Sequence, residues 1–113
     1  MTTHELAKTL AWKVLVPGMD REISCGYCGD LLSWVMGRAP QDSAWITVMT
    51  NINVAAVAVL CDVSCVVFAQ GAQPDATLRE RAETEGLTLL ATDDDIYSAA
   101  VGLNRVLNAV KSE

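Results

Sequence analysis

The chain has 113 residues, of which 51% are hydrophobic and 19% charged, and its formal net charge is −6. This length suits one domain, so we expect residues 1–113 to form a single unit. The few basic residues are scattered, which argues against nucleic acid and against an anionic membrane surface as partners, because both require clustered Lys and Arg.

The first part of the chain predicts a helix over 2–9, capped by Thr2 or Thr3, and a short strand over 13–16. A second strand is expected to begin at 22–24. The chain then enters a helix for which Asp30 is a suitable N-cap, because its carboxylate can accept hydrogen bonds from the first free backbone N–H groups.

The second part alternates between strand and helix patterns. The predicted strands cover 45–50, 65–69 and 87–91. The predicted helices cover an apolar segment that is capped by Asn51 or Asn53 and runs to about Cys61, and residues 76–85 and 92–110. Gly86 is the expected stop of the middle helix, since glycine readily adopts the left-handed conformation that ends a helix. Such alternation implies right-handed crossovers between parallel strands. The fold class is therefore α/β, a single domain with a mainly parallel sheet flanked by helices.

Three segments of the chain resemble short stand-alone DRTGG-domain proteins: GYCGDLLSWVM at 26–36, AWITVMTNINVAAVA at 44–58 and ATDDDIYSAA at 91–100. The resemblance extends over residues 6–107. It implies a fold like the N-terminal domain of HPr kinase/phosphorylase and a regulatory role, because in larger proteins this domain accompanies catalytic or CBS modules. The chain departs from the family in lacking a contiguous Asp-Arg-Thr-Gly-Gly, and its one Asp-Arg pair is Asp20-Arg21.

The sharpest chemical motif is the Cys-X-X-Cys formed by Cys25 and Cys28. Placed between a strand and a helix N-terminus, it is typical of a thioredoxin-type redox site, because the helix dipole lowers the pKa of the first thiol. The redox context is incomplete, since no Trp precedes Cys25 and Pro74 fits a helix start. Structural thiols, a redox pair and a metal site shared with Cys61 and Cys65 are the alternatives, and we expect Cys65 to be buried.

No complete catalytic set is recognisable. The one histidine, His4, lies near the N-terminus, and there is no phosphate-binding Gly-X4-Gly-Lys motif. The run Asp93-Asp94-Asp95 is read as favourable negative charge at a helix N-terminus rather than as a Mg²⁺ site. We expect no cofactor and no resident metal. With no signal peptide or membrane span recognised, reduced thiols and a cytoplasmic location are expected.

Small polar residues gather at three strand-to-helix junctions, where open parallel sheets bind ligands. The candidate ligand-binding residues are Gly26, Gly29, Asp30, Thr47, Thr50, Asn51, Asn53, Thr92 and Asp95. They suit a small anionic or nucleotide ligand. The same residues also serve as ordinary helix caps, with Asn51 or Asn53 capping one helix and Thr92 with Asp95 forming a capping box at another.

The sequence thus predicts a non-catalytic regulatory domain that binds a small ligand or a partner enzyme and forms a homodimer. Trp34 is a candidate for the dimer face, because Trp is enriched at interfaces. The alternative is a thiol-disulfide or metal-thiolate protein that uses Cys25 and Cys28.

Overall fold

The computed structural model describes residues 1–112. The strands are β1 (Lys13–Val16), β2 (Cys25–Cys28), β3 (Ser43–Thr47), β4 (Cys65–Phe68) and β5 (Thr88–Ala91). The helices are α1 (Thr3–Leu10), α2 (Leu32–Arg38), α3 (Asn53–Cys61), α4 (Ala76–Glu85) and α5 (Ile96–Ser112). Among these helices, none combines the length and the apolar character needed to cross a membrane.

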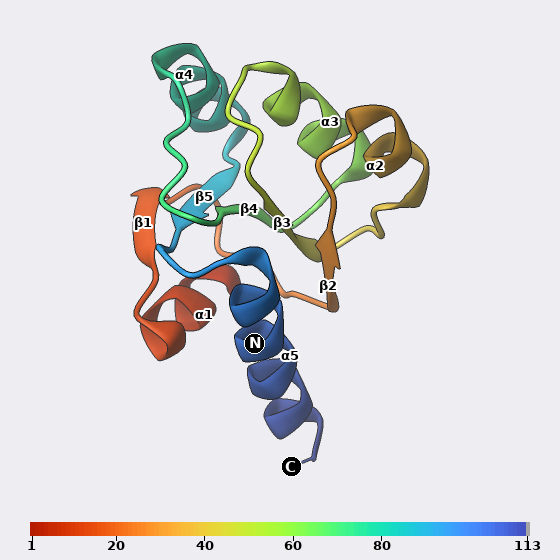
Figure 1. Cartoon of the computed structure of the whole chain (residues 1–113), viewed down its shortest axis with the longest axis vertical. Coiled ribbons are helices and arrows are strands. Elements are labelled where there is room, and N and C mark those ends of the chain that lie inside the picture. Colours follow the sequence, from red (N-terminus) through yellow and green to blue (C-terminus); the bar gives the residue numbers. More distant parts are fainter. Residues whose placement is uncertain (113) are drawn as a thin grey trace.

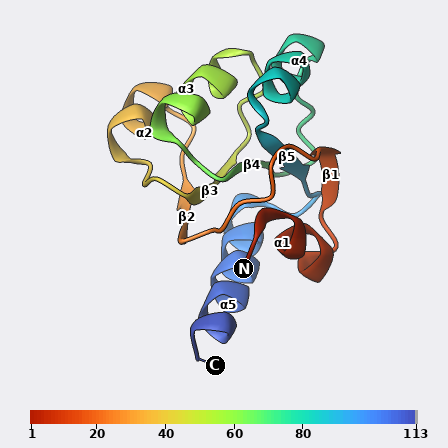
Figure 2. The same ribbon diagram turned by 180° about the vertical axis from the view of Figure 1, so that it is seen from behind.

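The strands form one sheet in the order β1-β5-β4-β3-β2. Strands β2 to β5 are parallel to their neighbours, and β1 pairs with β5 in the antiparallel sense. Each crossover steps one strand in the same direction, so right-handed connections place α2, α3 and α4 on one face. Helices α1 and α5 cover the other face (Figures 1 and 2). The predicted mainly parallel α/β sheet is confirmed.

The core lies on both faces of the sheet. On β3, Trp45 packs into the cluster beneath α2, α3 and α4, whereas its neighbour Ile46 packs into the cluster beneath α1 and α5. Both side chains are fully buried, as are Phe68 and Leu90 on the next strands. Burial on both faces explains why the central strands read as continuous apolar runs rather than as alternating patterns.

Local capping signals place the ends of two helices where the sequence predicts them. The Thr2 hydroxyl accepts a hydrogen bond from the backbone N–H of Glu5 and so caps α1. Helix α4 occupies the predicted residues, with the Asp75 carboxylate accepting the N–H of Leu78 at 2.9 Å. Gly86 ends α4 with φ of 68°, the left-handed conformation expected of it.

Two predicted strands are displaced. The strand expected from 22–24 begins at Cys25, because Glu22 forms only an isolated bridge with Thr2. The strand expected at 45–50 is β3, which ends at Thr47. It stops there because the next backbone N–H, that of Val48, bonds to the carboxylate of Asp30 instead of to a neighbouring strand.

Candidate functional site

A cleft of about 330 Å³ lies between the edge strand β2 and helix α5. All four residues of β2 line one side, and the other side includes Leu103, Asn104 and Leu107 of α5. Gly26 allows the two elements to lie close together, since a Cβ added to it would stand 2.6 Å from Cδ2 of Leu103. Among residues 1–109, whose side chains the structure describes, every side chain that lines the cleft is uncharged. The cleft therefore suits an uncharged group, because a buried charge here would have no charged partner.

The sequence context predicts that the Cys25-X-X-Cys28 motif lies at a helix N-terminus, and this prediction is wrong. The motif is strand β2 itself, and α2 begins only at Leu32, without a side-chain cap. Three steps along a strand separate the two Cα atoms by about 10 Å. Because a disulfide requires Cα atoms within about 7 Å, these two thiols cannot bridge while β2 is intact.

The environments of the thiols also differ from those of a redox pair. Successive residues of a strand face opposite ways, so Cys25 and Cys28 point to different faces of the sheet. Desolvation, with a smaller effect of the Asp30 carboxylate, raises the pKa of the Cys28 thiol. A raised pKa leaves less Cys28 thiolate at neutral pH, so Cys28 is not activated as a nucleophile.

The other two cysteines are used in packing. The Cys61 thiol lies 3.6 Å from the carbonyl oxygens of Val35 and Met36, and so connects α3 to α2. Cys65 is fully buried, as predicted, and burial raises its pKa to about 12. Within residues 1–112 no three His, Cys, Asp or Glu side chains come together as metal ligands. The four thiols therefore form no shared metal site in this part of the chain.

Asp30 is not the N-cap of α2, which corrects the sequence prediction. Its carboxylate accepts a hydrogen bond of 2.7 Å from the hydroxyl of Thr47 and one of 2.9 Å from the N–H of Val48. The backbone of Gly29 is also used, because its carbonyl accepts the indole N–H of Trp45 at 2.9 Å. The structure thus brings Gly29, Asp30 and Thr47 together as a joint between the ends of β2 and β3.

The N-cap position of α3 is Ile52, so the prediction that Asn51 or Asn53 occupies it is wrong. Asn51, the residue before Ile52, nevertheless bonds to the first turn of the helix. Its side-chain oxygen accepts the N–H of Asn53 at 2.9 Å, and its carbonyl accepts the N–H of Val54 at 3.0 Å. The carbonyl of Thr50 accepts the N–H of Asp75, which holds the loop before α4. Asn51 therefore satisfies donors that an anion at this helix start would otherwise contact.

Thr92 and Asp95 do not form the predicted capping box. Asp95 itself caps α5, accepting the N–H of Ser98 at 2.6 Å, and this hydrogen bond lowers the pKa of Asp95. The hydroxyl of Thr92 instead accepts the N–H of Asp94. The box fails because α5 begins one residue after Asp95, so Thr92 lies too far from the first turn.

A second, more open depression of about 470 Å³ lies beside the end of β5. Thr92, Asp93 and Asp94 line one side of it, and Lys13 and Gly71 line the other. Of the nine candidate ligand residues, Thr92 borders this depression and Gly26 borders the β2–α5 cleft. The carboxylates of Asp93 and Asp94 make the depression unfavourable for an anion.

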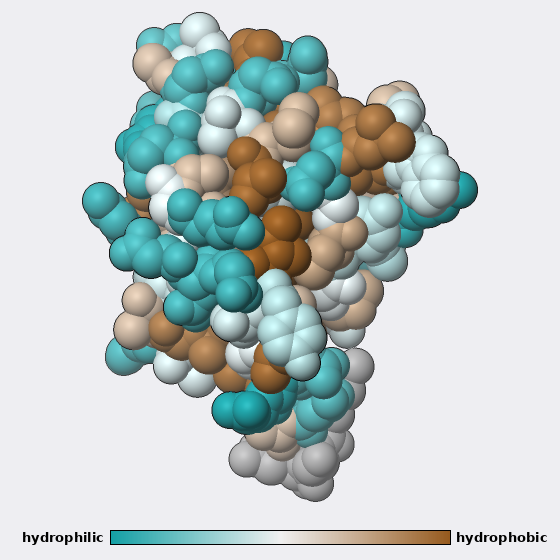
Figure 3. All heavy atoms as spheres, viewed as in Figure 1, coloured by the Kyte–Doolittle hydropathy of each residue, from teal (hydrophilic) through white to brown (hydrophobic). Residues whose placement is uncertain are grey.

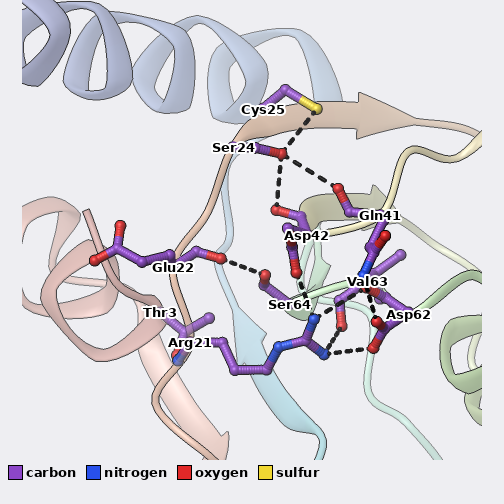
Figure 4. Close-up of polar contacts among 10 residues, drawn as sticks. All are labelled: Thr3, Arg21, Glu22, Ser24, Cys25, Gln41, Asp42, Asp62, Val63 and Ser64. Atoms are coloured by element: carbon purple, nitrogen blue, oxygen red, sulfur yellow. Dashed lines mark hydrogen bonds and ion pairs between the residues drawn. The ribbon is translucent and has the colours of Figure 1, made fainter.

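Sequence reasoning missed a polar cluster centred on Arg21, at the end of the sheet where β3 and β4 begin (Figure 4). The guanidinium donates to the carboxylates of Asp42 at 2.6 Å and Asp62 at 3.0 Å. It also donates to the carbonyl oxygens of Asp62 and Val63. Asp42 and Asp62 both adopt positive φ, 63° and 57°. Both aspartates precede strands at tight turns, and this was the available signal for the cluster.

No family model matches the chain, and neither does a curated protein. Among solved structures, the chain is similar to the CBS and DRTGG domains of the regulatory region of a Clostridium perfringens pyrophosphatase, in complex with its activator diadenosine tetraphosphate. The TM-score is 0.67 at 13% sequence identity, and the match covers 90% of this chain and 45% of the other. The chain thus spans less than half of that structure, and what the two share is an α/β fold.

Proposed function

We propose that this chain is a non-catalytic regulatory domain that binds a small ligand in the cleft between β2 and α5. The observation that carries the proposal is the likeness of fold to a regulatory region solved with a nucleotide activator. The cleft supports it, because a concave and largely apolar space with a few amide groups is the usual form of a small-ligand site.

The charges that line the cleft and the depression favour the β2–α5 cleft over the depression near β5 as the site for a nucleotide. The side chains described for the cleft are uncharged and include Asn104, whose amide can both donate and accept hydrogen bonds. The depression carries Asp93 and Asp94. A nucleotide would therefore place its base in the cleft and leave its phosphates in solvent. Adenine nucleotides are the first ligands to test.

The test is a thermal-shift and calorimetric titration of the protein with AMP, ATP and diadenosine tetraphosphate. Gly26→Ala reduces the cleft, because the added methyl group displaces Leu103 into it. Gly37→Ala is the matched control, since a Cβ at Gly37 meets nothing within 4 Å. We expect binding by the natural chain and by Gly37→Ala, and at least tenfold weaker binding by Gly26→Ala. Equal affinity in all three would place the ligand elsewhere.

We also propose that the domain is a homodimer. A protein of this size buries a limited share of its surface, so association adds apolar burial. Hydrophobic residues gather on the side of the molecule formed by α2 and α3 (Figure 3). Trp34 is 57% exposed there, with the guanidinium of Arg38 only 4.1 Å above its ring. Light scattering over a range of protein concentrations measures the dimer directly.

A further inference from the structure

The sheet has two edges, and they differ in how they are protected. At one edge, β1 carries the charged Lys13 and an irregularity in its pairing with β5 between Val14 and Val16. At the other edge, β2 has the sequence Cys-Gly-Tyr-Cys and pairs in register with β3 alone. Lysine and bulges are the usual devices that prevent edge strands from pairing with other chains. β2 has neither, nor does it contain a proline, so its outer backbone groups remain available.

Exposed apolar side chains lie next to this edge. Helix α2 is the last helix of its layer, on the side of the molecule where β2 ends the sheet (Figure 1). Leu31, just before α2, is 61% exposed, and Trp34 and Met36 within it are 57% and 51% exposed. On the opposite face of the sheet, the β2–α5 cleft opens beside the same strand. An unpaired strand, an apolar helix and an apolar cleft therefore meet at one edge.

We infer that a second copy of this chain docks here, with the two β2 strands paired in the antiparallel sense about a two-fold axis perpendicular to the sheet. The inference rests on the proposed homodimer and assigns its interface. The axis brings α2 beside its counterpart on one face and α5 beside its counterpart on the other. It joins two five-stranded sheets into one. Association stops at the dimer, because each copy has one free β2 edge and this contact uses it.

The alternation of side chains restricts the register. Directly opposed residues of an antiparallel pair point to the same face of the sheet. Gly26 and Tyr27 are neighbours on β2 and point to opposite faces. The axis must therefore pass at the level of a residue, such as Gly26 or Tyr27 in the middle of β2, and not midway between two residues. Each residue then meets either itself or a residue an even number of positions away. A pairing that sets Cys25 directly against the partner copy's Cys28 is excluded.

Large exposed side chains next to β2 supply apolar surface for such a contact. A standard interface takes about 800 Å² from each partner, roughly 60% of it apolar. Leu31, Trp34 and Met36 are each more than half exposed, so a second copy that docks on this edge covers three large apolar side chains of each partner. The outer side of β2 adds its backbone to the buried surface. Because each copy carries a net charge of −6, added salt should strengthen the association.

The experiment combines light scattering with hydrogen exchange. Cys28→Lys places like charges close to the axis, and Trp34→Glu places a charge on α2. Val14→Lys is the matched control, an equally charged change on the opposite edge strand. We expect the natural chain and Val14→Lys to dimerise, and the other two variants to need at least tenfold higher concentration. In the natural chain, the amides of 25–28 should exchange more slowly as the dimer forms.

The outcomes separate this inference from the proposed function. A dimer that survives both Cys28→Lys and Trp34→Glu, or whose 25–28 amides exchange as fast as in the monomer, overturns the interface but not the homodimer. A natural chain that stays monomeric at every concentration overturns both, while the ligand titration still tests the cleft. If Cys28→Lys loses the circular dichroism spectrum of the folded protein, the hydrogen exchange of the 25–28 amides in the natural chain decides whether β2 forms the interface.

Discussion

The carboxylate of Asp30 accepts a 2.7 Å hydrogen bond from the hydroxyl of Thr47, and this contact joins the ends of two neighbouring parallel strands. Thr47 is fully buried, whereas Asp30 is exposed. The same carboxylate accepts the N–H of Val48, so it ends β3 as well as fixing β2. A residue that the sequence marks as a helix cap and ligand contact thus stabilises the sheet.

Asp30→Ala should lower the free energy of unfolding by about 1–2 kcal/mol, because it leaves the buried hydroxyl of Thr47 and one backbone N–H without this acceptor. Asp30→Asn keeps an oxygen acceptor and should lose less than half of that amount. Urea unfolding measures both, with the exposed Asp93→Ala as the control. Equal stability of Asp30→Ala and the natural chain would show that the hydrogen bonds of Asp30 with Thr47 and Val48 contribute nothing to the free energy of unfolding.

Removal of the Arg21 guanidinium should be among the more damaging surface changes. Arg21→Met leaves the carboxylates of Asp42 and Asp62 and two carbonyl oxygens without their donor. We expect a loss of roughly 2–3 kcal/mol, reduced from the full value of a charged network because the side chain is partly exposed. Arg21→Lys should recover only part of it, since a single ammonium cannot donate in two parallel directions. Chemical unfolding at low and high salt provides the measurement.

Oxidation should not join Cys25 to Cys28 within one chain. The strand holds their Cα atoms about 10 Å apart, beyond the reach of a disulfide. After treatment of the folded protein with diamide, peptide mass spectrometry should find no bridge between them, whereas the same treatment in urea should produce one. The Cys25→Ser and Cys28→Ser variants should stay folded and should have the same metal content as the natural chain. A rapidly formed bridge in the folded protein, or zinc lost only in these variants, would instead support the thiol function.

Cys65 should make the protein less stable in alkali. Burial raises its pKa from 9.0 to about 12. Below pH 9 the thiol is neutral in both states, and the stabilisation is fully present. Above pH 9 the unfolded chain releases the proton while the folded chain keeps it. Stability should therefore fall by up to about 1.4 kcal/mol per pH unit as the pH rises from 9 toward 12.

The control for this pH dependence is Cys65→Ala, which removes the titrating group. Its unfolding free energy should decline less steeply with pH than that of the natural chain. The difference between the two slopes should correspond to the release of up to one proton per molecule on unfolding. Urea unfolding at pH 8, 9, 10 and 11 measures the two slopes. Parallel curves for the two proteins would mean that Cys65 is not the group responsible.

The sequence alone determined the elements whose ends depend on neighbours within three or four residues. Thr2 caps α1, Asp75 caps α4 and Gly86 ends α4 because a side-chain oxygen or a left-handed glycine acts on the adjacent turn. The strand–helix alternation from Trp45 onward likewise implied the parallel sheet, since a right-handed crossover is the one common way to join such strands. Burial of Cys65 followed from its apolar run.

The tertiary structure decided what depends on residues distant in the sequence. The Cys-X-X-Cys motif is a strand because β3 lies beside it and supplies its hydrogen-bond partners. Asp30 turns away from α2 because Thr47, 17 residues later, offers a buried hydroxyl. Arg21 meets Asp42 and Asp62, 21 and 41 residues away, only after β3 and β4 are aligned. A local pattern shows which hydrogen bonds a residue can make, and packing then selects which of them it makes.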